Sequence, residues 1–216
     1  MQHSRVLTLT LAALLVAAVL AGCSTPTFET PKRTLTPYET VVFPDANLEK
    51  AIREALGKPA GEQIIAADLD KLTSLCAGFY GIGDLSGLEN CTNLTELSIA
   101  GCNVSDISCL SSLTNLRVLS LSGNPISDIS PLSSLTNLTM LALAAAQIHD
   151  ISPLASLPNL KELHIWGNQI SDISPLVKNQ GLAAGDIVDL RINPLSKKSV
   201  NTYIPQLKAR GVEVSY

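Results

Sequence analysis

The sequence predicts an α/β solenoid in which one short strand and one short turn alternate along the chain. Three observations lead to this prediction. Apolar residues return every 22 residues, an apolar–polar–apolar triplet marks one strand in each interval, and a Ser-Pro pair follows the strand in the most regular copies. Because a single repeat cannot bury its apolar face alone, neighbouring repeats must stack to form a common core.

The 22-residue spacing holds in several columns at once. Two of these columns consist of Leu72, Leu94, Leu116, Leu138, Leu160 and Leu182, and of Leu75, Leu97, Leu119, Leu141 and Leu163. Columns of Ile or Val and of Asp keep the same spacing. Side chains that recur at one period in several columns are expected to lie over one another, which defines a repeat region of five to six coils over residues 72–195.

The most regular copies carry a family resemblance. Residues 113–134 read LTNLRVLSLSGNPISDISPLSS. The pattern L-x-x-L-x-L-x-x-N-x-I, followed by S-D-I-S-P-L, resembles the 22-residue leucine-rich repeat of the internalin type. The resemblance covers about residues 72–195. It implies a right-handed coil with a parallel, concave β-sheet, short 3₁₀ turns on the convex side, and helical N- and C-terminal caps.

The chemistry of the repeat predicts the same arrangement. The L-x-L triplet is typical of a strand with one buried face, and one such strand per coil gives parallel neighbours ~4.8 Å apart. Serine at a helix N-cap and proline at the first helical position are favourable, so Ser130-Pro131, Ser152-Pro153 and Ser174-Pro175 predict short turns rather than long helices. We expect five to six strands, to which the C-terminal residues VEVSY could add an edge strand.

One polar position in each coil is expected to connect neighbouring coils. An asparagine after the strand can bond backbone groups of the adjacent coil, which gives a ladder along the solenoid. The residues at this position are Tyr80, Cys102, Asn124, Ala146, Asn168 and, after a shift, Asn193. Since alanine offers no amide, we expect the ladder to be interrupted at Ala146 and residues 144–146 to be the weakest joint.

Both open ends of the stack need covers. At the N-terminal side, the cap of residues 41–71 contains a predicted helix over residues 44–57, with Asp45 as its N-cap, Leu48, Ala51, Ile52 and Ala55 on one face, and Gly57 after its end. At the C-terminal side, residues 196–216 place Val200, Tyr203, Ile204 and Leu207 on one face, and Pro205 should kink or split the helix. Three extra residues near 181–186 precede the last strand of the repeat.

The first 40 residues predict secretion and membrane attachment. Residues 1–22 combine Arg5 with a 15-residue apolar run, which is shorter than the ~20 residues of a membrane span and indicates a signal peptide. The sequence Leu20-Ala21-Gly22-Cys23 resembles a bacterial lipobox, and this resemblance implies a lipid on Cys23. The alternative is an ordinary signal peptide in which Cys23 is incidental. Residues 23–40, rich in Ser, Thr and Pro, are predicted to form a disordered tether.

Composition and motifs exclude most other functions. The formal charge is −4 without a basic cluster, which does not suggest nucleic-acid binding. The sequence has no Gly-rich phosphate loop and no H-E-x-x-H motif, so we expect no enzyme, no cofactor and no metal. The column of Asp84, Asp106, Asp128, Asp150 and Asp172 could suggest calcium, but bonding of the turn backbone explains it better. Four cysteines remain after Cys23, and we expect no essential disulfide.

The candidate ligand site lies at the C-terminal end of the concave face. Strand residues that alternate with the buried ones point outward. They include Glu96, Met140, Glu162, His164, Trp166, Asp189 and Arg191. An exposed Trp beside Arg is typical of a binding hot spot, which predicts a protein or peptide partner for an envelope-anchored monomer. One alternative partner is a cell-wall glycan or surface polysaccharide. Another interpretation is that Trp166 only covers the next coil. An enzyme would depend on His164 with Glu162 or Asp189.

Overall fold

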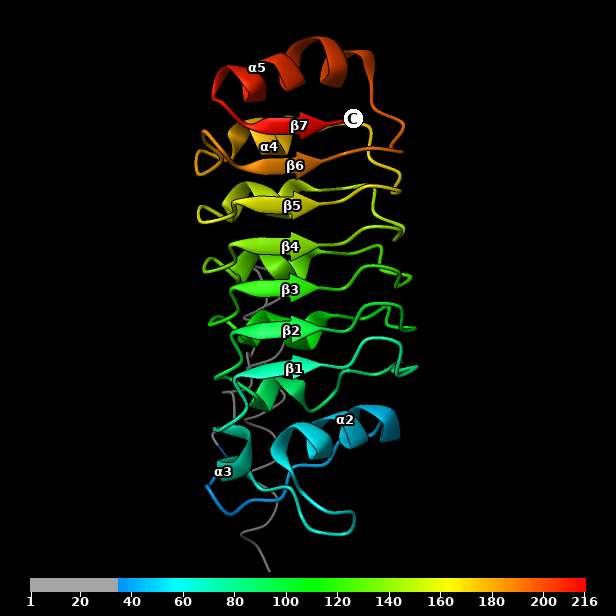
Figure 1. The fold of residues 1–216 in the computed structure, drawn as a ribbon, viewed down its shortest axis with the longest axis vertical. Helices are drawn as coiled ribbons and strands as arrows, with labels where there is room; N and C mark the ends of the chain where they lie inside the picture. The colour runs from blue at the N-terminus through cyan, green and yellow to red at the C-terminus, as the bar shows by residue number, and fades with distance from the viewer. Residues whose placement is uncertain (1–34) are drawn as a thin grey trace, which may run out of the picture. The chain divides into compact units, whose positions relative to one another are not determined.

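Residues 35–216 are the part of the chain described by the computed structural model, and they build one parallel sheet with turns behind it (Figure 1). The sheet has seven strands in sequence order, so each strand pairs with the strand of the next coil. The strands are β1 (Ser74–Cys76), β2 (Glu96–Ser98), β3 (Val118–Ser120), β4 (Met140–Ala142), β5 (Glu162–His164), β6 (Ile187–Asp189) and β7 (Glu213–Ser215). The predicted α/β solenoid with a parallel sheet is therefore confirmed, and β7 is the additional edge strand.

The apolar columns form the core. All leucines of the columns that begin at Leu72 and Leu75 are at most 3% exposed. Strands β1 to β5 pair without slip at the 22-residue spacing, so that Leu97 lies opposite Leu119 and Leu119 opposite Leu141. The aliphatic side chains of one coil consequently pack on those of the next, and the burial that no single coil could achieve comes from its neighbours.

Short turns lie behind the sheet, as expected. They are η1 (Leu88–Asn90), η2 (Ser108–Ser112), η3 (Ser130–Ser134) and η4 (Ser152–Ser156), followed by the single α-helical turn α4 (Ser174–Lys178). The predicted serine N-cap is wrong. Ser130 is the first residue of η3 and its side chain makes no cap bond, whereas the Oδ1 of Asp128 accepts the N–H of Ser130 at 2.8 Å. The aspartate column thus caps these turns.

Three asparagines connect the coils behind the ends of the strands. The side-chain amide of Asn124 donates to the carbonyl oxygens of Ile99 and Leu121 at 2.7 and 2.9 Å, and its Oδ1 accepts the N–H of Val104 at 3.0 Å. Asn168 and Asn193 repeat this pattern. At Ala146 the ladder is interrupted, and the N–H of Ile126 bonds the carbonyl of Asn124 within its own turn instead.

Helix α2 (Ala46–Leu56) covers the N-terminal end of the core. Asp45 is its N-cap and accepts the N–H groups of Asn47 and Leu48 at 2.9 and 3.0 Å. Leu48, Ala51 and Ile52 are buried as predicted, but Ala55 is exposed. Leu56, four residues after Ile52, packs against the core in its place, because residues four apart share one helix face.

A second short helix, α3 (Ala66–Leu69), was not predicted and completes the N-terminal cap. The Nζ of Lys58 pairs with Asp68 of this helix at 2.7 Å. The N–H groups of Ala66 and Ala67 donate to the carbonyls of Glu39 and Pro37, and Thr40 forms a bridge with Ile65. The last residues assigned to the tether are therefore part of the cap.

The C-terminal cap is a split helix followed by an edge strand. A π-helical turn η5 (Ser199–Tyr203) is followed by α5 (Ile204–Ala209), and Pro205 lies in the first turn of α5, which agrees with the predicted split. Ile204 and Leu207 are buried, while Val200 and Tyr203 are half-buried. After α5 the chain turns at Gly211 and enters β7 beside β6.

No helix within residues 35–216 has the length and apolar character needed to span a membrane. The predicted signal peptide and Cys23 lie outside the described residues, as does most of the predicted tether.

Candidate functional site

The side chains that alternate with the buried strand residues form what we call the open sheet face. The register places them in straight columns. The first column contains Ser74, Glu96, Val118, Met140, Glu162, Ile187 and Glu213, and the second contains Cys76, Ser98, Ser120, Ala142, His164, Asp189 and Ser215. The columns predicted from the 22-residue spacing are thus observed, including the shifted sixth coil.

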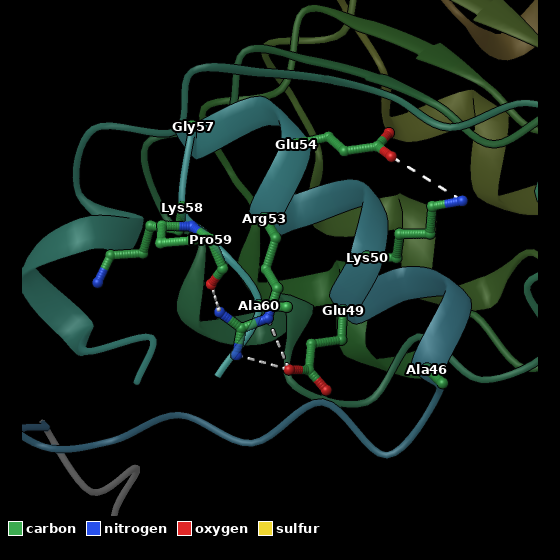
Figure 2. Close-up of a pocket in the computed structure, with 9 residues that line it drawn as sticks. All are labelled: Ala46, Glu49, Lys50, Arg53, Glu54, Gly57, Lys58, Pro59 and Ala60. Atoms are coloured by element: carbon green, nitrogen blue, oxygen red, sulfur yellow. Dashed lines mark hydrogen bonds and ion pairs between the residues drawn. The ribbon is translucent and has the colours of Figure 1, made fainter. Parts of the chain in front are cut away.

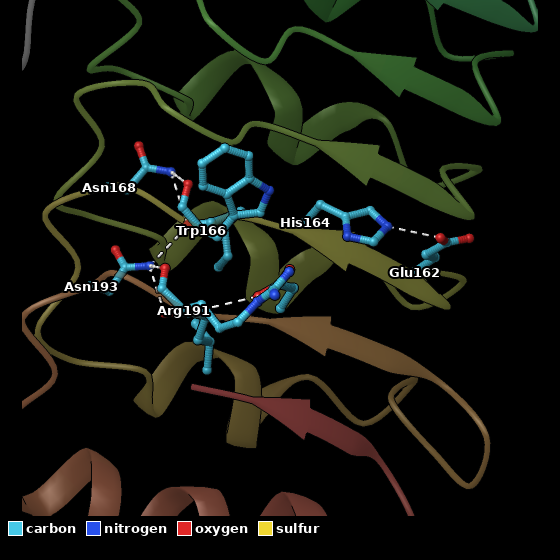
Figure 3. A network of polar contacts seen from close by, with 9 residues as sticks. Glu162, His164, Trp166, Asn168, Arg191 and Asn193 are labelled. Carbon is cyan, nitrogen blue, oxygen red and sulfur yellow. Dashed lines mark hydrogen bonds and ion pairs between the residues drawn. The ribbon is translucent and has the colours of Figure 1, made fainter.

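Four charged or titratable residues gather at the C-terminal end of this face, and we call them the polar cluster: Glu162, His164, Asp189 and Arg191. Figure 3 shows Glu162, His164 and Arg191 of this cluster. The Nε2 of His164 lies 2.8 Å from Oε1 of Glu162 on the same strand. His164 is also the register partner of Asp189 on β6. The cluster therefore joins two neighbouring strands, as the sequence predicted.

Asp189 and Arg191 form a bidentate ion pair. The Nε and Nη2 of Arg191 donate to Oδ1 and Oδ2 of Asp189 at 2.9 and 2.6 Å. Hydrogen bonds from Arg191 lower the pKa of Asp189, whose side chain is 8% exposed. The Arg191 side chain remains 62% exposed, so its other N–H donors and its planar face stay accessible in a fixed position.

Trp166 stands next to this pair. Its coil meets that of Arg191 through a hydrogen bond from the N–H of Gly167 to the carbonyl of Arg191. Trp166 is 37% exposed, so part of the indole packs on the protein and part is open to a partner. Two aliphatic residues add apolar surface nearby: Ile187 is 39% exposed and Ile192 is 78% exposed.

The remaining two predicted residues lie at different distances from the cluster. Met140 is half-buried and is the register partner of Glu162, so it borders the cluster directly. Glu96 lies on β2, three strands before Glu162, which corresponds to roughly 14 Å at ~4.8 Å per strand. The structure therefore does not bring Glu96 into contact with the other candidates.

A column of left-handed residues beside the strands was missed by the sequence analysis. The equivalent positions are Phe79, Gly101, Gly123, Ala145, Gly167 and Ile192, all with φ between +52° and +71°. A side chain is strained there, yet Phe79 and Ile192 occupy it and are 85% and 78% exposed. Aligning the glycines of the repeat would have shown these two departures and a third at Ala145.

The described residues offer no metal site, since no three His, Cys, Asp or Glu side chains among residues 35–216 gather closely enough to hold an ion. The aspartate column has a structural use instead. Each Oδ1 accepts the N–H of a serine two residues later at 2.8 Å, and this bond helps to lower the pKa of Asp84, Asp128 and Asp172.

The four cysteines after Cys23 have free thiols. Burial raises the pKa of Cys91 and of Cys109 to about 12. Cys102 occupies the asparagine position and donates weakly to the carbonyl of Ala77 at 3.5 Å, while Cys76 is exposed on the open sheet face. Because the thiolate is the reactive form, Cys91 and Cys109 are poor nucleophiles at neutral pH.

A groove of about 580 Å³ runs along the outer side of α2 (Figure 2). Its charged side chains are bonded to one another or to the main chain. Arg53 pairs with Glu49 at 2.7 Å and donates to the carbonyl of Pro59 at 3.1 Å, and Lys58 pairs with Glu62 at 3.0 Å. With these groups already satisfied, the groove is a weaker candidate than the open sheet face.

Comparisons with known proteins agree with the fold. Families of leucine-rich repeats match residues 90–110, 114–155 and 136–178. The structure is similar to that of the internalin InlF from Listeria monocytogenes, with a TM-score of 0.67 and 28% identity over 80% of this chain. It also resembles a leucine-rich-repeat protein from Leptospira interrogans, with a TM-score of 0.61 and 21% identity over 69% of this chain.

The chain spans only part of both proteins, 56% of the InlF chain and 38% of the Leptospira chain. No curated protein sequence matches it. The matched repeats and the parallel sheet together establish a leucine-rich-repeat solenoid, and the likeness to InlF supports repeats of the internalin type.

Proposed function

From a leucine-rich-repeat solenoid with internalin-like structural neighbours, we propose that this protein is a binding module, not an enzyme, and that it recognises a protein or peptide. The open sheet face is the recognition surface, and Trp166 with the polar cluster at its C-terminal end makes the main contact. The observation that carries the proposal is the fixed Asp189–Arg191 pair beside a partly exposed tryptophan.

Trp166, Ile187 and Arg191 can each contribute favourably to the free energy of binding a partner. A partner that covers Trp166 and Ile187 would remove apolar surface from water. Since Asp189 already orients Arg191, a partner carboxylate or carbonyl could bond its free donors without the entropic cost of ordering that side chain. A half-exposed aromatic next to a pre-oriented arginine is the composition that binding hot spots favour.

Replacing Trp166 with alanine is expected to reduce capture of the native protein partner by roughly tenfold, as for loss of a hot-spot residue. The measurement is affinity capture from a cell-surface extract, with captured proteins quantified by mass spectrometry. Tyr38→Ala is the matched control, because Tyr38 is an aromatic residue of the N-terminal cap that is 85% exposed. Equal recovery with the wild type and Trp166→Ala would contradict the proposal, as would tryptophan-dependent retention on purified cell-wall glycan.

We also propose that a lipid on Cys23 anchors the protein to a bacterial membrane or cell envelope, outside the cytoplasm. The proposal is supported by the apolar run that ends in Leu20-Ala21-Gly22-Cys23. Cys23→Ser is expected to abolish incorporation of labelled fatty acid and to move the protein from the membrane fraction to the soluble fraction. Cys76→Ser is the control, since it removes an exposed thiol of the folded part. Unchanged labelling of Cys23→Ser would contradict the anchor.

A further inference from the structure

The arrangement of carboxylates on the open sheet face indicates the chemistry of the partner. We infer that the first column of this face accepts an extended basic segment in which two cationic side chains, about 14 Å apart, flank an apolar one. This inference rests on the proposed function and adds the charge and spacing of the partner. It concerns residues along the whole face, not only those beside Trp166.

From β2 to β7 the first column contains only acidic and apolar side chains. In order from β2 to β7 it contains Glu96, Val118, Met140, Glu162, Ile187 and Glu213. Glu96, Ile187 and Glu213 are exposed, and the other three are half-buried. At ~4.8 Å per strand, Glu162 lies about 14 Å from Glu96, and Val118 and Met140 fill the space between them.

These carboxylates have few cationic partners of their own. Within residues 35–216, Glu96 and Glu213 form no ion pair, and Glu162 pairs only with His164. Glu96 accepts a long hydrogen bond of 3.4 Å from the hydroxyl of Ser74. The nearest cations in sequence, Arg117 and Lys161, precede the column by one residue at the rim of the sheet and are exposed. The acidic side chains are thus available to a cationic partner.

The surrounding charge favours the same partner. Residues 35–170, which hold the N-terminal cap and the first five strands, contain 14 Asp and Glu residues but 6 Lys and Arg residues. Such an excess attracts a basic chain at long range, which raises the rate of encounter at low ionic strength. The carboxylates of the first column then determine which positions the cationic side chains of the partner occupy.

The spacing also selects the conformation of the segment. Side chains i, i+2 and i+4 of an extended chain point to one side, and four residues at ~3.4 Å span about 14 Å. A sequence K-x-Φ-x-K-x-Φ, where Φ is apolar, would place its lysines at Glu96 and Glu162. Its first apolar residue would lie over Val118 and Met140, and its second near Ile187.

Met140 offers a direct way to observe this complex. The chain has two methionines, and the other is Met1, which the predicted signal peptide contains. In the mature protein labelled with ¹³C-methyl methionine, Met140 therefore gives one NMR signal at the middle of the column. The probes are capped peptides KSLSKSL, its scrambled form KKSSLSL and the acidic form ESLSESL. Only KSLSKSL is expected to shift the Met140 signal in a saturable way.

A pair of triple variants separates the column from net charge. E96Q/E162Q/E213Q removes three carboxylates of the column, and D106N/D128N/D150N removes three from the turn column. Asparagine can still accept the turn N–H in the second variant. We expect the first variant to weaken KSLSKSL binding about tenfold, equivalent to two lost ion pairs, and the second to change it less than about twofold.

Equal losses in the two variants would assign the binding to bulk charge and overturn the inference. It would also be overturned if KKSSLSL bound as tightly as KSLSKSL, or if no peptide moved the Met140 signal. The proposed function would survive these results, because capture of the native partner by Trp166 is measured separately. Unchanged capture of the native partner by Trp166→Ala, with the peptide result intact, would instead contradict the tryptophan-centred site.

Discussion

Replacing Asn168 with alanine is expected to lower the free energy of unfolding by about 3 kcal/mol, because three buried backbone groups would lose their partners at about 1 kcal/mol or more each. The side-chain amide donates to the carbonyls of Leu143 and Ile165 at 2.9 and 3.0 Å, and Oδ1 accepts the N–H of Ile148 at 3.1 Å. Asn168 is 6% exposed, so water could replace these bonds only by opening the coil. Urea unfolding followed by circular dichroism would measure the loss.

The neighbouring coil makes this loss more severe. At Ala146 no side-chain amide connects the coils of β3 and β4. Asn168→Ala would therefore leave two successive contacts between neighbouring coils without a side-chain amide. In a solenoid, where each repeat depends on its neighbours, this favours separate unfolding of the two halves. We expect the urea transition to broaden, with a smaller m-value, because less surface would be exposed in each step.

Two further variants test this interpretation. Ala146→Asn is expected to have the opposite sign and to stabilise the chain by about 1 kcal/mol, since its amide could reach the Leu121 and Leu143 carbonyls. Gln169→Ala, beside Asn168 but exposed, should change stability by less than about 0.5 kcal/mol. Similar effects of Asn168→Ala and Gln169→Ala would show that the amide ladder contributes little.

The periodic part of the fold was accessible to sequence analysis because each column has one physical role. Leu119 and Leu141 recur at the spacing of the coil, and a register shifted by one residue would turn them to the solvent face. The same reasoning found the outward columns, since residues two apart on a strand share a face. It was wrong about the serine N-caps, since the aspartates two residues earlier, such as Asp128 before Ser130, accept the turn N–H. Serine and aspartate can both cap a turn, and the sequence alone does not decide between them.

The candidate site was predicted less completely, for reasons of geometry. The outward positions of His164 and Trp166 follow from periodicity. The pairing of Arg191 with Asp189 depends on rotamers, and the half-burial of the indole depends on the neighbouring coil. Phe79 and Ile192 went unnoticed because exposed apolar residues on left-handed backbone contradict local preference. Departures of this kind are detected only when each coil is compared with the others.

The 22-residue periodicity does not predict the environment of Gly181. It lies in the irregular segment between α4 and β6, where the chain makes a sharp approach to the preceding coil. A Cβ atom built on Gly181 would overlap the carbonyl oxygen of Pro158 and lie 2.5 Å from its carbonyl carbon. The N–H of Gly181 is meanwhile fixed by the Oδ1 of Asn179 at 2.8 Å, and Asn179 is itself buried. The amide of Asn179 also donates to the carbonyl of Leu157 at 2.9 Å, so separating the two segments would break this bond or the one to Gly181.

Gly181→Ala is therefore expected to destabilise the protein by about 3 kcal/mol, at the upper end for overpacking because the obstructing atoms belong to the main chain. Gly185→Ala is the matched control in the same loop: its φ is +88° but no atom lies within 4 Å of the added Cβ. It should cost only the left-handed strain of about 1 kcal/mol. Thermal and urea unfolding of both variants would measure the two losses of stability. A larger loss for Gly185→Ala would mean that backbone conformation, and not the close approach to Pro158, governs this loop.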